Sequence, residues 1–153
     1  GGRVGAGYTA EIGSMNVTEQ VDAIKALGAD PVRKLVMPRV LAMVIALPLL
    51  TMLADLVGCF GGVIITVIEV GVTIRFVFEQ MVETLWIVDL LHGLSKSVFF
   101  GYLIGIIGCW NGLRTFGGTE GVGIATTRTV VFISVAILVS DFALTRLFLA
   151  IYG

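Results

Sequence analysis

The chain has 153 residues, of which 57% are hydrophobic and only 14% are charged, and its net charge at pH 7 is -1. An ordinary soluble domain is about 45–50% apolar and about 25% charged, so a mean hydropathy of +1.02 predicts an integral membrane protein. The absence of a basic run in the sequence argues against a nucleic-acid partner.

Residues 1–12 are rich in small side chains and are compatible with the end of a span that starts earlier. Arg3 and Glu11 then lie at the edge of that span. We expect them to pair with each other or to face a partner on the cytoplasmic side.

Residues 17–28 predict a short amphipathic helix. Asn16 is a candidate N-cap, and Glu19 three residues later completes a capping-box pattern. Gly28 is suited to a left-handed C-cap, and Pro31 prevents the helix from continuing. The apolar positions that share one face are Val17, Val21, Ile24 and Leu27.

This helix is too short to be stable alone, so its apolar face needs a surface. It either lies on the lipid headgroups or docks into a groove of a cytoplasmic partner. The polar side carries both signs of charge and few basic residues, which favours the partner.

Three nearly uncharged stretches are long enough to cross the hydrocarbon, which takes about 20 helical residues. We expect spans near 38–69, 89–111 and 129–152. The predicted fold is an all-α membrane protein with three complete transmembrane helices, the end of an earlier span and a short cytoplasmic amphipathic helix.

Basic residues predict the orientation of these spans. They gather before the first span and in the 111–128 loop, whereas the 70–88 connection holds Arg75 against Glu79 and Glu83. The first two regions should face the cytoplasm and the third should face outward. The cytoplasmic basic residues are Lys25, Arg33, Lys34, Arg39, Arg114 and Arg128.

Charged side chains at membrane depth are costly, so each one suggests a role. Asp55 and Asp141 either make structural hydrogen bonds or line a lipid path. Asp89, His92 and Lys96 share a face at the outer end of the second span. They form either an interfacial anchor or a site where Lys96, with His92, meets a lipid phosphate.

Two GxxxG pairs are candidates for close helix contacts, since small residues let helix backbones approach each other in lipid. They are Gly58 with Gly62 and Gly101 with Gly105.

Four blocks occur in an order that resembles the MlaE (YrbE) family of ABC-transporter permeases. They are GGRVGAGYTAEIGSM at 1–15, EQVDAIKALGADPVRKLVMPR at 19–39, KSVFFG at 96–101 and GVGIATTRTVV at 121–131. The resemblance covers essentially the whole chain, taken as one permease domain over 1–153 that lacks the family's N-terminal part.

The resemblance implies a multi-pass permease of the bacterial inner membrane that moves phospholipids to or from the outer envelope. It implies a homodimer, separate cytoplasmic ATPase subunits that bind ATP and Mg, and a periplasmic lipid-binding protein of the MCE type. By the same resemblance, the 19–39 block includes the ATPase-coupling residues. These are Glu19, Gln20, Asp22, Ala23, Leu27, Gly28, Asp30 and Pro31.

The chain carries no Walker A motif, so any ATP hydrolysis belongs to another polypeptide. No nucleophile, acid and base occur in a catalytic pattern, which argues against a membrane-embedded lipid enzyme. A membrane scaffold that recruits a cytoplasmic partner without transport is the alternative to a permease.

Overall fold

The computed structural model describes residues 1–84 and 87–152, and all of its regular elements are helices. In chain order they are α1 (Gly2–Val17), α2 (Gln20–Ala26), a π-helical segment η1 (Val32–Val36), α3 (Met37–Val70), α4 (Ile74–Thr84), α5 (Ile87–Leu113) and α6 (Gly118–Tyr152). The expected all-α architecture is confirmed.

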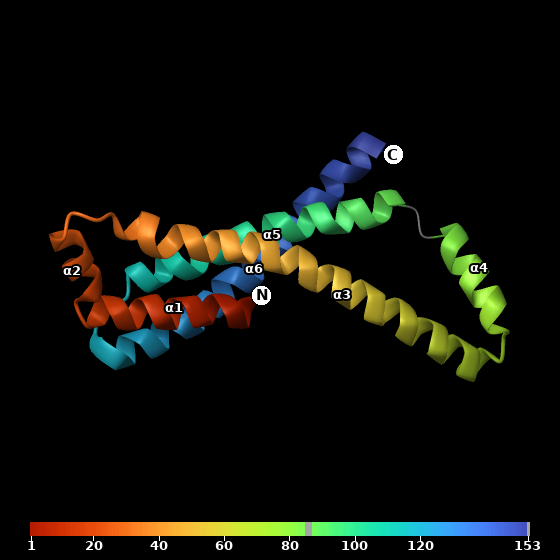
Figure 1. Cartoon of the computed structure of the whole chain (residues 1–153), viewed down its shortest axis with the longest axis horizontal. Helices are drawn as coiled ribbons and strands as arrows, with labels where there is room; N and C mark the ends of the chain where they lie inside the picture. Colours follow the sequence, from red (N-terminus) through yellow and green to blue (C-terminus); the bar gives the residue numbers. More distant parts are fainter. Residues whose placement is uncertain (85–86, 153) are drawn as a thin grey trace.

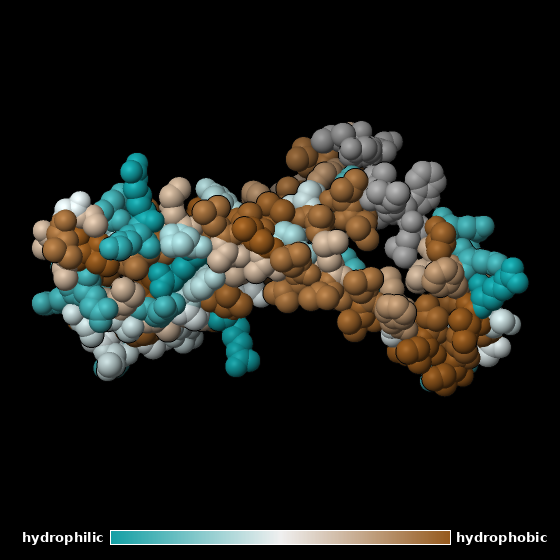
Figure 2. All heavy atoms as spheres, in the orientation of Figure 1, coloured by the Kyte–Doolittle hydropathy of each residue, from teal (hydrophilic) through white to brown (hydrophobic). Residues whose placement is uncertain are grey.

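Three helical stretches are long and apolar enough to cross a membrane: Val32–Val70, Leu90–Leu113 and Gly118–Ala150. The predicted number of complete transmembrane helices is therefore confirmed. Large apolar side chains lie exposed along all three, as expected where lipid replaces water around the protein. Figure 2 shows hydrophilic residues at the end that carries α2 and again beside α4, with a mainly hydrophobic stretch between.

The bundle is formed by α1, α3, α5 and α6, with α5 in contact with each of the other three. Figure 1 shows α2 and the turn between α5 and α6 at one end of the bundle, and α4 at the other. A small apolar cluster lies where these helices meet: Met43, Ile104 and Ile133, with Tyr8, Leu47, Ile107 and Ile137 packed against it.

Close approach of α3 and α5 depends on two glycines. A Cβ added to Gly101 would lie 2.7 Å from the Met43 carbonyl oxygen, and one added to Gly105 would lie 3.0 Å from Val40 Cα. Apart from the neighbouring backbone of α3 itself, no atom of the described residues lies within 4 Å of a Cβ built on Gly58 or Gly62. Of the two predicted GxxxG pairs, only Gly101 and Gly105 make a helix contact within the described chain.

The second half of α3 diverges from α5 and leads to α4 (Figure 1). Its large apolar side chains are exposed, among them Val57, Phe60 and Ile68. α3 and α4 are joined at a short turn, and a cleft of about 530 Å³ lies between them, lined by residues such as Thr66 and Met81. This hairpin leaves a long apolar helix face without a neighbour in the described chain.

One sequence expectation requires correction, and one connection contains a helix that was not predicted. The connection between the second and third spans was expected to be the 111–128 loop, but α6 already begins at Gly118, so residues 118–128 are helical. The 70–88 connection, for which the sequence analysis predicts only an outward position, contains the separate helix α4. α6 extends beyond its uncharged stretch because a helix need not end where hydrocarbon ends.

Candidate functional site

The link between α1 and α2 differs from the predicted capping box. Asn16 lies inside α1, and its side-chain amide donates to the Thr115 carbonyl oxygen at 2.9 Å. Thr18 ends α1 by donating from its hydroxyl to the Ser14 carbonyl at 2.8 Å. The chain then turns at Glu19, whose φ of 60° is left-handed, and no side chain caps α2. The capping box is wrong because Asn16 has a tertiary partner 99 residues away.

The short helix α2 turns part of its predicted apolar face toward the bundle. Val21 is 1% exposed and Ile24 is partly buried, whereas Leu27 is 85% exposed. Gly28 has the predicted left-handed conformation, with φ of 75°. Its N–H donates to the Lys25 carbonyl, and the next N–H donates to the Ile24 carbonyl, which is a Schellman cap.

The predicted coupling residues form one accessible surface at this end of the molecule. We call it the coupling surface; its exposed members are Glu19, Gln20, Asp22, Ala23, Leu27, Gly28 and Asp30, with Pro31 partly buried. Asp22 forms an exposed ion pair with Lys25 at 2.9 Å, and Asp30 accepts a hydrogen bond from the Val32 N–H at 3.0 Å. Contact of this surface with an ATPase remains a prediction.

The coupling surface connects to α3 through η1, a π-helical turn of the kind often found at functional sites. Arg39 donates to the Leu35 carbonyl at 3.0 Å and pairs with Glu11 of α1 at 2.7 Å. The Arg39 side chain is only 18% exposed. Of the two pairings expected for Glu11, that with Arg3 is not seen, and Arg3 is exposed. The ion pair joins the start of α3 to α1 immediately beyond η1.

A buried hydroxyl cluster joins α1, α5 and α6. The Thr9 hydroxyl lies 2.8 Å from the Gly108 carbonyl oxygen and 2.9 Å from the Thr129 hydroxyl. The Asn111 amide donates to the Thr129 hydroxyl at 3.0 Å. Thr9 and Thr129 are both fully buried. Sequence reasoning missed this cluster, because a threonine in an apolar helix gives no sign of whether its hydroxyl is satisfied locally or across helices.

Replacing Thr9 with Val should lower the free energy of unfolding by about 1–2 kcal/mol, since the shape is kept while a buried interhelical hydrogen bond is lost. The measurement is titration of the full-length purified protein with SDS, followed by circular dichroism. Thr126→Val is the matched control, because within the described part of the chain the Thr126 hydroxyl donates only to the Gly123 carbonyl of its own helix. Equal losses in both variants would contradict a tertiary role for Thr9.

At the opposite end of the bundle, α5 and α6 are joined by polar side chains. Lys96 Nζ lies 2.8 Å from the Thr145 hydroxyl and 3.3 Å from an Asp141 carboxylate oxygen. His92 stacks on Phe148 with ring centroids 4.4 Å apart. The structure thus brings together three predicted site residues: Lys96, Asp141 and His92. The side chain of Asp89, expected on the same face, lies outside the described residues.

Asp55 lies apart from this cluster, on the exposed half of α3. Among the described residues it belongs to none of the four ion pairs. Within the same residues, no three His, Cys, Asp or Glu side chains gather closely enough to hold a metal ion. Polar chemistry therefore divides between the coupling surface at one end of the bundle and Lys96 with Asp141 near the other.

Comparison with known proteins identifies the family of this chain. The family described as Permease MlaE matches residues 1–147. A probable ABC transporter permease protein of Synechocystis is 46% identical over 95% of this chain and 56% of its own length. The intermembrane phospholipid transport system permease protein MlaE of Haemophilus influenzae is 38% identical over 95% of this chain and 56% of its own length.

A chloroplast relative, the protein trigalactosyldiacylglycerol 1 of Arabidopsis thaliana, is 38% identical over 96% of this chain and 42% of its own length. The chain therefore spans about half the length of the curated relatives it matches. Its three apolar helices and the family match together make it a multi-pass membrane protein. By sequence match and architecture, the chain belongs to the MlaE permease family.

Proposed function

We propose that this chain forms part of the permease subunit of an ABC transporter that moves phospholipids between the inner membrane and the outer envelope of a bacterium. The observation that carries the proposal is the coupling surface. A short helix with a buried Val21 presents an exposed rim of polar residues at the end opposite α4. A water-soluble partner can contact this rim without disturbing the bundle.

The partner we propose is a separate cytoplasmic ATPase that binds ATP and Mg. Closure of its nucleotide sites would displace α2, and η1 would transmit this displacement to α3. Because Arg39 ties α3 to Glu11, the start of α3 and the end of α1 would move together. The π-helical turn supplies the place where the helix can shift its register, since one extra residue per turn is held there.

We further propose a second copy of the chain as the neighbour of the exposed half of α3. Single transmembrane helices gain no hydrophobic drive toward each other in lipid, but a carboxylate in the middle of an apolar span favours a protein neighbour. Asp55 is such a carboxylate, whereas Glu69 lies at the end of α3. On the outer side, an MCE-type lipid-binding protein would receive or deliver phospholipid near α4, Lys96 and Asp141.

Photocross-linking of the full-length protein in its native membrane tests the assignment of α2. A photoreactive amino acid in place of Leu27, which is 85% exposed, should yield a covalent adduct with an ABC ATPase subunit. The same group in place of Phe78, which is 57% exposed on α4, should give no ATPase adduct. ATPase adducts from Phe78, or none from Leu27, would contradict the proposal and favour a scaffold without transport.

A further inference from the structure

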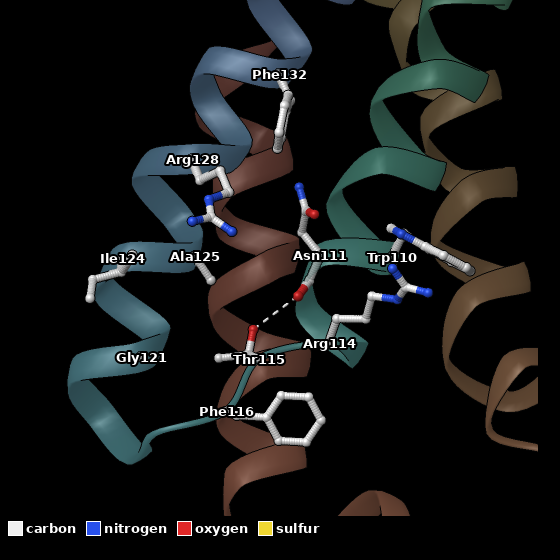
Figure 3. A pocket seen from close by; sticks show the side chains of 10 residues that line it. All are labelled: Trp110, Asn111, Arg114, Thr115, Phe116, Gly121, Ile124, Ala125, Arg128 and Phe132. Atoms are coloured by element: carbon white, nitrogen blue, oxygen red, sulfur yellow. Dashed lines mark hydrogen bonds between the residues drawn. The ribbon is translucent and has the colours of Figure 1, made fainter.

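A cleft of about 620 Å³ lies between the end of α5 and the start of α6 (Figure 3). It is at the same end of the bundle as α2, since Thr115 in its wall accepts the hydrogen bond from Asn16. Asn111 of the buried hydroxyl cluster lines the cleft, whereas no residue of the coupling surface and neither Lys96 nor Asp141 does so. Its charged and large apolar lining residues are Trp110, Arg114, Phe116, Ile124, Arg128 and Phe132.

Two guanidinium groups line this cleft, one from the turn that follows α5 and one from α6. Arg114, in the turn, lies over the Trp110 ring, 4.2 Å from its centroid. Arg128 of α6 reaches toward Asn111 from the other side (Figure 3). None of the four ion pairs among the described residues includes either arginine. Glu120, the acid of the first turn of α6, is exposed and is not part of the lining.

The remaining polar groups of the cleft are already engaged. The Thr115 hydroxyl donates to the Asn111 carbonyl at 2.9 Å, and the Asn111 amide donates to Thr129. The charged donors in the lining are the two guanidinium groups, and the Trp110 indole N–H is a further, neutral donor. Planar guanidinium groups match the geometry of phosphate oxygens and bind them by charge-assisted hydrogen bonds.

The apolar lining of the cleft favours a lipid over a soluble anion as its ligand. Phe116 is 78% exposed and Trp110 is 54% exposed, and Phe132 continues the apolar wall along α6. A free phosphate gains nothing from these surfaces, whereas the glycerol and upper acyl chains of a lipid do. The cleft also lies at the end where basic residues gather, which the positive-inside rule predicts to be the side of the anionic cytoplasmic leaflet.

We propose that this cleft holds the phosphate group of an anionic phospholipid of the cytoplasmic leaflet, with Arg114 and Arg128 as its ligands. The bound lipid joins the end of α5 to the start of α6. The site is distinct from the Lys96 and Asp141 contact at the other end of the bundle. It stands whether or not the protein transports lipid.

Native mass spectrometry of the full-length protein with its partner subunits tests this site. The protein is released from nanodiscs that contain equal amounts of phosphatidylglycerol and phosphatidylcholine. Wild type should retain phosphatidylglycerol, and Arg114→Gln/Arg128→Gln should lower that retention by about tenfold or more, because charge-assisted hydrogen bonds are lost. Arg75→Gln/Arg146→Gln removes the same charge outside the cleft and should retain the lipid.

Several results would overturn the proposal. One is equal retention of phosphatidylglycerol by a folded Arg114→Gln/Arg128→Gln protein, and another is equal loss in the control. Full displacement of the lipid by millimolar inorganic phosphate would assign the cleft to a soluble anion instead. If the glutamine variant does not fold, Arg114→Lys/Arg128→Lys replaces it; this variant keeps the charge but loses the bidentate geometry, so unchanged retention would contradict a phosphate held by both arginines.

Discussion

Charge reversal of the coupling surface, by Glu19→Lys with Asp22→Lys, is expected to lower lipid-stimulated ATP hydrolysis of the reconstituted complex by about tenfold or more. Both side chains are exposed, and a like charge placed against a complementary partner surface costs at least about 1.4 kcal/mol. The folded chain itself should be little affected, because the Asp22 to Lys25 pair that is lost lies at the surface. Phosphate release by complexes in liposomes measures the effect.

Glu19 needs its own control because its backbone is left-handed. Glu19→Gly removes the carboxylate while relieving that conformation, so it should keep or raise the thermal stability of the protein. If the carboxylate contacts the ATPase, Glu19→Gly should still reduce hydrolysis. Glu79→Lys on α4 is a matched reversal at the other end, with its own ion pair to Arg75. Normal hydrolysis in the double reversal would indicate a scaffold that does not couple.

Gly101→Val is expected to lower the free energy of unfolding by about 3 kcal/mol, the upper end of the range for overpacked interiors. The new side chain would meet backbone atoms of Met43 and Val44, which cannot rotate away, so α3 and α5 would have to separate. SDS titration of the full-length protein, followed by circular dichroism, measures the loss. Transport by the complex should also decrease, because α3 is the helix that receives the proposed displacement of α2.

Gly58→Val provides the comparison, because Gly58 belongs to the other GxxxG pair, in α3. No atom of the described chain lies within 4 Å of a Cβ built at Gly58, so the monomer should keep its stability. A change in oligomeric state of this variant would place Gly58 at the interface with a second copy. Equal destabilisation by Gly58→Val and Gly101→Val would contradict the close contact of α3 with α5.

The elements themselves were largely predictable from the sequence. Long uncharged stretches indicate transmembrane helices because hydrocarbon forces each backbone polar group to bond within its own segment. Gly28 was also predictable, since a left-handed position after a helix favours glycine. α4 was not predicted, although its apolar residues Ile74, Val77 and Met81 recur at helical spacing. The sequence analysis used the charged residues of this segment only to predict that it faces outward.

The partners of the polar residues were not predictable. Glu11 pairs with Arg39, Lys96 with Asp141, and Thr9 lies against Thr129, 120 residues away. Asn16 matched a capping motif and instead donates to Thr115. In each case a residue nearer in sequence offered an equally good chemical partner. The position of a residue in the sequence therefore does not show which partner it contacts.

The sequence by itself determined the solvent of this protein, the number of its spans and the helical class of its fold, because transfer of side chains into lipid depends on composition and length alone. Only the tertiary structure decided which glycine pair brings two helices together, which carboxylate meets which cation, and where two arginines share a cleft. Those outcomes depend on the rotation and depth of each helix against its neighbours. Packing and interhelical hydrogen bonds set these two variables, and hydropathy does not.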